Sequence, residues 1–223
     1  MSETFSFLSS FWNNPAEICS VVPTFSWSAR KIARVIPPDV WQQKLLINEC
    51  GPGTGAITDQ IRRLMSEDSR LVLVEKDRAL ADLLKHKFAA DPRITVHTEG
   101  AEHIEGIMQR YGRADLNFNM TPITIMPDVV RTRMLDGIRN SLTETGRSVT
   151  ALFRPFAVPR ILRDHFPVVR YRGIAPLNVP PLFIFESRTV VPTLETVAST
   201  TVECRRLAAK MDFEMDLLTL DRT

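Results

Sequence analysis

Apolar runs that predict buried strands alternate with segments of helical spacing through the first two thirds of this 223-residue chain. The predicted strands span residues 44–50, 71–75, 94–98, 115–118 and 148–153. Helices are predicted near residues 26–35, 56–65, 77–88, 101–110 and 128–141. Parallel neighbours in a sheet need crossover connections of this kind, so the alternation predicts a parallel sheet with helices on both faces. Ligands of such sheets bind at the carboxyl ends of the strands.

The rest of the chain predicts additions to this sheet. Residues 168–172 and 182–190 have strand character and flank a proline-rich loop, so we expect a carboxyl-terminal antiparallel hairpin that brings the sheet to seven strands. We expect residues 1–36 to form helices that serve as a lid or an interface. We expect residues 37–191 to form the main domain, and residues 192–223 to form an extension that packs on this domain or on a second subunit.

A glycine-rich turn, Glu49-Cys-Gly-Pro-Gly-Thr-Gly55, lies between a predicted buried strand and a predicted helix. Glycines at such a turn let the backbone approach a ligand closely. The glycine spacing is shorter than that of the dinucleotide fingerprint, and no Lys-Ser/Thr pair follows as in a phosphate-binding loop. Glu75 ends the next strand, where a carboxylate can accept hydrogen bonds from two ribose hydroxyls. The pattern therefore indicates a ligand with a ribose and little need for anion capture.

Residues 49–58 and 71–77 resemble the cofactor motifs of class I S-adenosylmethionine-dependent methyltransferases. Four outer segments are similar, in order and spacing, to the bacterial phospholipid N-methyltransferases, which themselves resemble rRNA adenine dimethyltransferases. These segments are residues 11–15, 22–23, 119–127 and 178–181. The resemblance covers about residues 7–188 and implies a Rossmann-like methyltransferase fold, with S-adenosyl-L-methionine as cofactor and S-adenosyl-L-homocysteine as product.

The resemblance also implies roles for single residues. The positions that it assigns to the cofactor are Glu49, Gly51, Gly53, Gly55, Glu75, Lys76, Glu99 and Asn119. The glycines would pass under the methionine and ribose, Glu49 would help to hold the ammonium group, and Glu75 would bind the ribose. Glu99, with Glu102 as its alternative, would lie near the adenine. Asn119 would also act in catalysis, by positioning the methyl acceptor beside the sulfonium.

The residues after Asn119 indicate which class of molecule accepts the methyl group. Nucleobase amino methylases place an aromatic residue after Asn/Asp-Pro to stack on the base, whereas this chain has Asn119-Met-Thr-Pro-Ile123, so we expect no nucleic-acid partner. The phospholipid enzymes have Ser-Gly-Leu-Pro here, so headgroup specificity does not carry over. No Lys or Arg precedes Arg30, whereas basic residues would attract an anionic membrane. The apolar amino-terminal segment therefore predicts a lid or a subunit contact rather than stable membrane insertion.

A carboxylate acceptor needs no base and only a cationic clamp, and Arg154 begins an arginine-rich segment after the fifth strand. We therefore predict O-methylation of a small carboxylic acid, with Asn119 and Arg154 as catalytic residues. Two alternatives stay open. One is N-methylation of phosphatidylethanolamine, and the other is a catalytically silent subunit, against which the intact glycine turn and Glu75 argue.

Composition narrows the class of protein further. The chain has a formal net charge of +2, and its 28 basic and 26 acidic residues are unevenly distributed: residues 1–29 and 192–223 each carry an acidic excess. The three cysteines are too widely spaced for a disulfide framework or a paired metal site, and we expect no metal. No apolar stretch is long enough to span a bilayer, and no basic leader precedes the first helix, so we expect a cytoplasmic protein. The apolar ends predict a homodimer. His103 and His165 are candidate bases.

Overall fold

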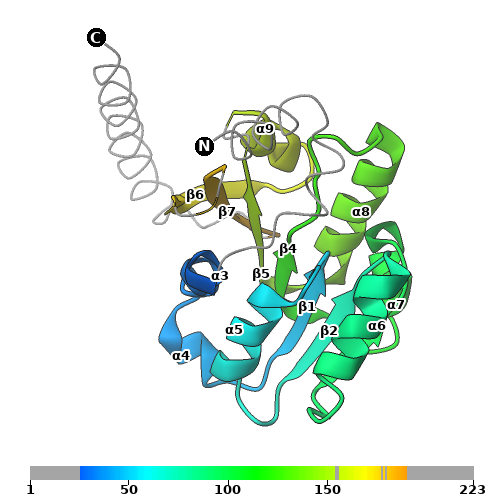
Figure 1. The fold of residues 1–223 in the computed structure, drawn as a ribbon. Helices are drawn as coiled ribbons and strands as arrows, with labels where there is room; N and C mark the ends of the chain where they lie inside the picture. Colours follow the sequence, from blue (N-terminus) through cyan, green and yellow to red (C-terminus); the bar gives the residue numbers. More distant parts are fainter. Residues whose placement is uncertain (1–25, 154–155, 177, 179, 190–223) are drawn as a thin grey trace, which may run out of the picture. The chain divides into compact units, whose positions relative to one another are not determined.

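A computed structural model describes residues 26–153, 156–176, 178 and 180–189, which carry seven strands (Figure 1). The strands are β1 (Leu46–Cys50), β2 (Arg70–Val74), β3 (Ile94–His97), β4 (Ala114–Asn119), β5 (Leu142–Leu152), β6 (Val168–Ala175) and β7 (Leu182–Arg188). The helices of these residues are α3 (Ser26–Ala33), α4 (Pro38–Trp41), α5 (Ala56–Leu64), α6 (Arg78–Lys87), the 3-10 helix η1 (Ala101–His103), α7 (Ile104–Met108), α8 (Asp128–Ser141) and α9 (Ala157–Arg163).

The strands form one mixed sheet in the order β3-β2-β1-β4-β5-β7-β6. The first five strands in this order are parallel, and β7 is antiparallel to both of its neighbours. The order reverses between β1 and β4, which is where open α/β sheets bind their ligands. The predicted Rossmann-like sheet with an antiparallel carboxyl-terminal hairpin is confirmed.

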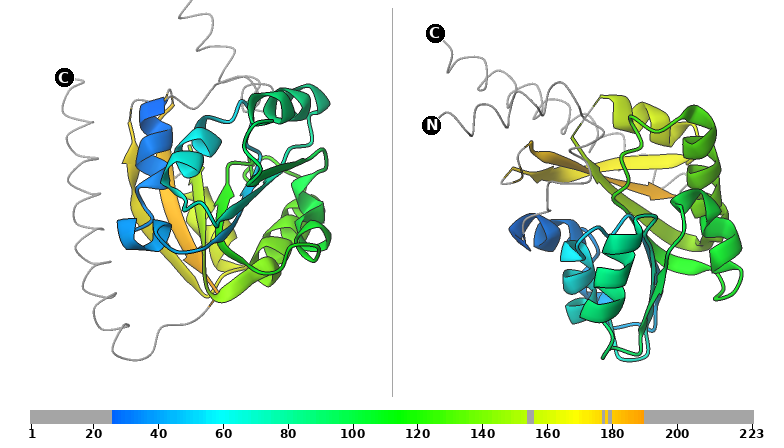
Figure 2. Two further views of the ribbon diagram at one scale, coloured as in Figure 1. Left: turned by 90° about the horizontal axis from the view of Figure 1, so that it is seen from below. Right: turned by 45° about the vertical axis from the view of Figure 1, so that its right-hand side comes forward.

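Helices cover both faces of the sheet, as Figure 2 shows. Residues of α3, α4, α5 and α6 pack against one face, and residues of α7, α8 and α9 pack against the other. Strands β1 and β2 are buried along almost their whole length because helices lie on both sides of them. The side chain of Asp77 caps α6 by accepting a hydrogen bond from the Leu80 N–H at 3.0 Å.

Three elements differ from the sequence expectation. Helix α3 ends at Ala33, two residues before the predicted end, and Pro38 begins the single turn α4, because proline fits the first position of a helix. Strand β5 begins at Leu142, immediately after α8, six residues earlier than predicted. Helix α9 was not predicted at all; it occupies part of the arginine-rich segment.

The helices predicted before residue 26 and the extension predicted over residues 192–223 lie outside the described residues, so the proposed division into terminal segments and main domain stays a prediction. Within the described part of the chain, no helix is long and apolar enough to cross a membrane. In the same residues, no three potential metal ligands come together.

Candidate active site

The glycine turn connects β1 to α5 through three residues with left-handed backbone conformations. The φ angles are 71° at Gly51, 57° at Gly53 and 81° at Gly55. A Cβ at Gly55 would lie 2.9 Å from Cδ2 of Leu84, whereas a Cβ at Gly53 would meet no atom within 4 Å. Gly55 is therefore required by packing against α6. Gly53 leaves an open approach to the backbone, as a cofactor cradle requires.

Glu75 braces this turn from the end of β2. The Gly53 N–H donates to Oε2 of Glu75 at 3.1 Å, and the Asp77 N–H donates to Oε1 at 3.0 Å. The side chain is almost fully buried. Because each carboxylate oxygen has two acceptor sites, one on each oxygen stays available for a ribose hydroxyl after the turn has been held in place.

Glu49, on the neighbouring strand β1, has no exposed surface. The Thr58 hydroxyl donates to its Oε2 at 2.7 Å, while its Oε1 has no hydrogen-bond partner in the described residues. Burial raises the pKa of this carboxyl to about 8, against a lowering by the Thr58 hydrogen bond. A buried, unpaired carboxylate oxygen suits a cationic group of a ligand. The residues of this site therefore fit the ammonium group and ribose of S-adenosylmethionine.

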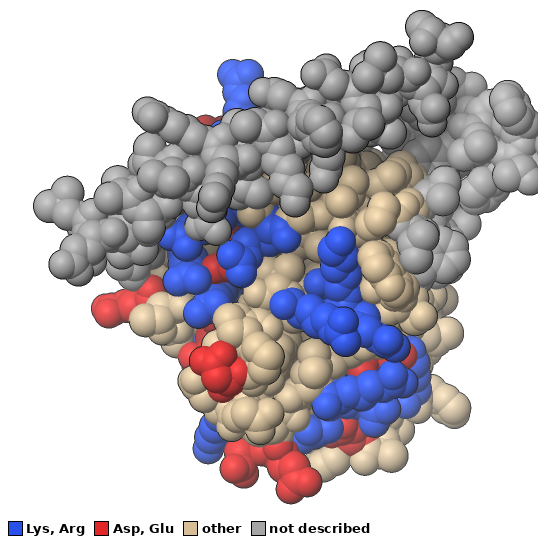
Figure 3. All heavy atoms as spheres, turned by 90° about the vertical axis from the view of Figure 1, so that its left-hand side faces the viewer, with Lys and Arg blue, Asp and Glu red and all other residues tan. Residues whose placement is uncertain are grey.

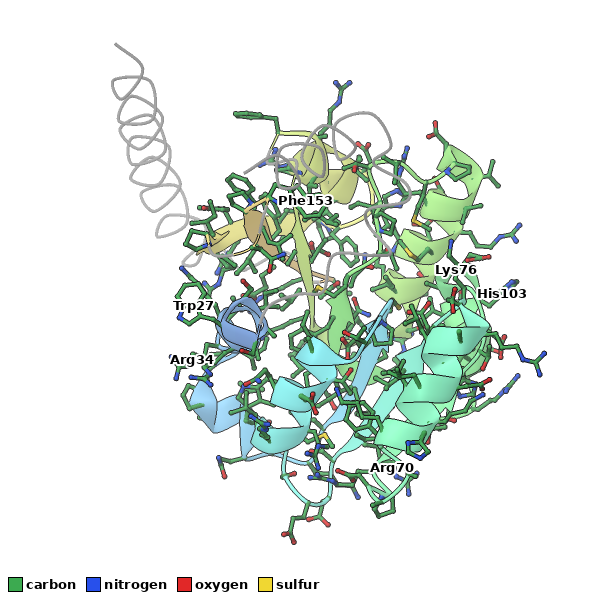
Figure 4. All side chains as sticks on the ribbon, viewed as in Figure 1. Trp27, Arg34, Arg70, Lys76, His103 and Phe153 are labelled. Atoms are coloured by element: carbon green, nitrogen blue, oxygen red, sulfur yellow. The ribbon has the colours of Figure 1, made fainter. Side chains whose placement is uncertain are left out.

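The segment after β3 carries both carboxylates expected near an adenine. Oε1 of Glu99 lies 3.7 Å from Nδ1 of His97, and the Glu99 side chain is 40% exposed. The Glu102 carboxylate instead folds back over Gly100, so that a Cβ on Gly100 would overlap it. Lys76 is exposed at the start of the β2–α6 turn, and Figure 4 shows it with His103 on the side of the molecule that carries α6 and α7.

Asn119 ends β4 directly beside the glycine turn and is fully buried. Its Oδ1 accepts two hydrogen bonds from Thr121, from the N–H at 3.2 Å and from the hydroxyl at 2.6 Å. Its Nδ2 has no partner among the residues described. The carboxyl ends of β1, β2 and β4 thus bring Glu49, Glu75 and Asn119 to one edge of the sheet.

The arginine-rich segment does not form a single cluster at this edge. Arg154 lies outside the described residues, and Arg160 and Arg163 are exposed on α9. Arg172 pairs with the buried Glu186 of β7, with Nε 3.3 Å from Oε2. Figure 3 shows Lys and Arg gathered on the face that carries α3 and α4 (left in Figure 1).

His103, His165 and Cys50 lie in surroundings that do not favour a role in the reaction. His103 is exposed, and Nδ1 of His165 lies 3.0 Å from Oδ1 of Asp136 on α8, before the amino end of β6. Neither is held at the carboxyl edge of β4. Burial raises the pKa of the Cys50 thiol to about 12, as expected for a small buried residue rather than a reactive thiol.

Sequence reasoning missed two hydroxyl residues that control the site. Thr58 is the partner of Glu49, and Thr121 fixes the Asn119 amide. Their signal was present in the motifs, as the last residue of Ala56-Ile-Thr58 and as the third residue of Asn119-Met-Thr121, but neither spacing reveals a hydrogen-bond partner.

Comparisons with known proteins agree with this geometry. The family model for ribosomal RNA adenine dimethylase matches residues 4–102, which include β1, the glycine turn and β2. The ornithine lipid N-methyltransferase of Singulisphaera acidiphila is 27% identical over 192 residues, which are 85% of this chain and 98% of the relative. The chain is a class I S-adenosylmethionine-dependent methyltransferase.

Solved structures share the fold of this methyltransferase. The N-methyltransferase NodS from Bradyrhizobium japonicum, in complex with S-adenosylhomocysteine, has a TM-score of 0.55 at 11% identity, over 74% of this chain and 88% of its own. The 16S rRNA N2 G1207 methyltransferase RsmC from T. thermophilus, in complex with AdoMet and guanosine, has a TM-score of 0.58 at 15% identity, over 75% of this chain and 44% of its own. The cofactor of this methyltransferase is S-adenosylmethionine, as the sequence predicted.

Proposed function

We propose that this methyltransferase methylates the primary amine of an amino-lipid headgroup. The observation that carries the proposal is the match to the ornithine lipid N-methyltransferase, which extends over 98% of that relative's length. A match of this extent continues far beyond the cofactor motifs, which supports a shared class of acceptor as well as a shared cofactor. This is the class of activity that the sequence ranked second, behind O-methylation of a small acid.

The same proposal assigns the cofactor residues. Glu49 pairs with the ammonium group through its free Oε1, the glycine turn passes under the methionine and ribose, and Glu75 accepts from the ribose hydroxyls. Lys76 lies at the ribose end, and Glu99 or Glu102 lies near the adenine. When bound, the cofactor supplies an activated methyl group and its leaving group. The protein aligns the acceptor for in-line displacement and excludes water.

An amine acceptor must reach the site as the neutral base, because a protonated amine has no lone pair. Amines of this kind have a pKa of about 10 in water, so kcat at saturating cofactor should rise with pH through the neutral range. A carboxylate, with a pKa of about 4, is fully ionised over the same range and should give a flat profile. The pH profile therefore separates N-methylation from O-methylation.

O-methylation of a carboxylic acid stays the second candidate because the Asn119 NH2 group, which has no partner in the described part of the chain, can bind an acceptor oxygen. This candidate includes Arg154 as the predicted cationic clamp for the carboxylate, and a substitution at Arg154 tests that role. An Arg154→Gln variant that lost turnover on acids and kept turnover on amines would support a clamp role for this residue.

The deciding experiment compares acceptors under one assay. The enzyme is mixed with vesicles that contain an ornithine lipid or phosphatidylethanolamine, or with soluble carboxylic acids and amines, and release of S-adenosylhomocysteine is measured. We expect turnover on an amino lipid, with the methyl group on its headgroup nitrogen. Glu75→Ala should abolish this turnover, whereas Glu67→Ala, an exposed site before β2, should not. Turnover confined to soluble acids would overturn the proposal.

Two further expectations belong to this proposal. We expect a homodimer that forms through the terminal segments, which light scattering tests; a monomeric mass would remove it. We also expect a cytoplasmic protein that meets its lipid at the membrane surface without insertion. Fractionation of cells would test this, since recovery from the membrane only with detergent would contradict it.

A further inference from the structure

A buried polar layer crosses β4 and β5 on the face covered by α8. Ser148 of β5 donates from its hydroxyl to Oδ1 of Asn117 at 2.7 Å, and Nδ2 of Asn117 donates to Sγ of Cys50 at 3.8 Å. Asn117 and Ser148 are neighbours in the strand register. Asn117, Ser148 and Cys50 therefore meet partners inside the protein, whereas their register neighbours Asn48 and Ser187 are buried with side-chain atoms that have none in the described residues.

Two residues further along each strand, nearer the carboxyl edge of the sheet, the corresponding pair of β4 and β5 lies at the ligand-binding edge. Asn119 and Thr150 are neighbours in the same register, and because strand side chains alternate, they lie on the same face as Asn117 and Ser148. Both residues are fully buried. Yet Nδ2 of Asn119 and Oγ1 of Thr150 have no hydrogen-bond partner within the described ranges. Buried polar groups without partners are costly. Others occur in the described residues, among them Asn48, Thr143 and Ser187, so it is the position of Asn119 and Thr150 at the ligand-binding edge that points to a ligand.

Thr121 determines which group Asn119 presents. A backbone N–H can only donate, so the Asn119 atom that faces the Thr121 N–H must be the carbonyl Oδ1. The Thr121 hydroxyl occupies the same oxygen at 2.6 Å. The amide is therefore fixed with its NH2 group as the available end. An NH2 group cannot accept a hydrogen bond from an amine, but it can donate one to an oxygen.

We propose that Asn119 and Thr150 form a two-donor site for an oxygen of the methyl acceptor, with Thr121 as the residue that positions the Asn119 amide. The inference rests on the proposed function and deepens it: the acceptor carries a carbonyl or carboxylate oxygen in the same headgroup as the amine that is methylated. A headgroup with an amino-acid structure meets this requirement, whereas a simple alkylamine headgroup does not. Thr150 is thus a residue for acceptor specificity.

The test uses two lipids with headgroups of equal length, one that carries a carboxylate in addition to the amine and one that carries the amine alone. The variants are Thr150→Val, which removes the hydroxyl at nearly constant volume, and Thr150→Ser, which keeps it. Thr143→Val is the matched control, because Thr143 lies on the same strand at the opposite edge and its Oγ1 is likewise buried without a partner in the described part of the chain.

We expect the wild-type enzyme to prefer the oxygen-bearing lipid. Thr150→Val should lower kcat/KM for that lipid about 10-fold and leave kcat/KM for the simple amine unchanged, since one hydrogen bond to the acceptor is lost. Thr150→Ser should restore the preference. The KM for the cofactor should not change, and the Tm of Thr150→Val should equal or exceed that of the wild type, because an unpaired buried hydroxyl has been removed.

The positioning role of Thr121 is tested in the same assay. Thr121→Val should lower kcat for the oxygen-bearing lipid with little change in cofactor KM, and Thr121→Ser should recover it. A purely structural role would instead lower the Tm and reduce turnover on both lipids equally.

The outcomes separate this inference from the proposed function. A Thr150→Val enzyme that keeps the wild-type preference, or that loses rate equally on both lipids, overturns the inference and leaves the proposed function intact. If the wild type methylates only soluble acids, the proposed function fails, and the variants are compared on that acid, where Thr150→Val should still lose about 10-fold. Turnover on no acceptor at all overturns both.

Discussion

The protonation of Glu49 should control how cofactor affinity depends on pH. The carboxyl group is fully buried and its pKa is raised to about 8, so the free enzyme holds it protonated near neutral pH. Pairing with the cofactor's ammonium group requires the carboxylate. Each pH unit below the pKa adds about 1.36 kcal/mol to the cost of binding, which is tenfold in Kd. Between about pH 8 and about pH 6 the affinity should therefore fall up to about 100-fold.

The same pKa makes a prediction about stability. The pKa in the folded protein lies above the value of 4.5 for the free side chain, so between these values the unfolded state binds fewer protons than the folded state. Stability of the free enzyme should therefore fall as pH rises from 4.5 to about 8 and then level off. The full interval corresponds to a contribution of at most about 5 kcal/mol. Glu49→Gln should remove this contribution, so its Tm should exceed that of the wild type more at about pH 8 than at about pH 5.

Isothermal titration calorimetry with S-adenosylmethionine from about pH 6 to about pH 8, in two buffers of different ionisation enthalpy, measures both the affinity and the protons released. We expect the wild type to release close to one proton at the acidic end. Glu49→Gln should bind more weakly at about pH 8, with no proton release. Thr58→Val should move the profile to higher pH, because it removes the hydrogen bond that lowers the pKa. A wild-type profile that is flat, or that Glu49→Gln reproduces, would refute the reasoning.

Three further predictions concern single residues. Gly53→Ala should cost about 1 kcal/mol of stability, from its left-handed φ alone, and should weaken cofactor binding at least about 10-fold. Gly55→Ala should lower stability further, because its Cβ would lie 2.9 Å from Leu84. Equal stability of the two variants by thermal melting would contradict this. In a background without the other two cysteines, Cys50 should resist iodoacetamide at about pH 8 until the protein unfolds, because its pKa is about 12; rapid labelling of the native protein would oppose this view. Asn119→Ala should lower kcat about 100-fold with little change in cofactor Kd, and a variant with wild-type kcat would exclude Asn119 from acceptor positioning.

Strands β1 and β2 could be predicted because helices on both faces bury them, which requires apolar residues at almost every position. The first part of β5 was missed for the opposite reason: Thr143, Glu144 and Thr145 are polar and partly or fully exposed, so they carry no apolar signal. Helix α9 was missed because Pro159 and the arginines around it resemble a loop, although proline near the start of a short helix is tolerated. Local sequence reveals burial on two faces better than it reveals short elements near the sheet edge.

The residues of the candidate site also differ in how far they could be predicted from the sequence. Residues within one strand–turn–helix unit, such as the glycines and Glu75, could be predicted from their spacing, and the structure brings them together. The Asn119–Thr150 pair depends on the register between β4 and β5, which the sequence does not specify. The pKa of Glu49 depends on complete burial by residues from several elements. The resemblance implied that Glu49 helps to hold the ammonium group, but it did not reveal that the carboxyl group must first lose a proton.

The most direct test of this account is the product formed on lipid vesicles. The wild-type enzyme, S-adenosylmethionine and vesicles that contain an ornithine lipid are incubated, and the extracted lipid is fragmented in a mass spectrometer. The account predicts an added methyl group on a headgroup nitrogen, absent with Glu75→Ala. Unmodified lipid, together with methyl esters formed from soluble acids in a parallel reaction, would contradict it.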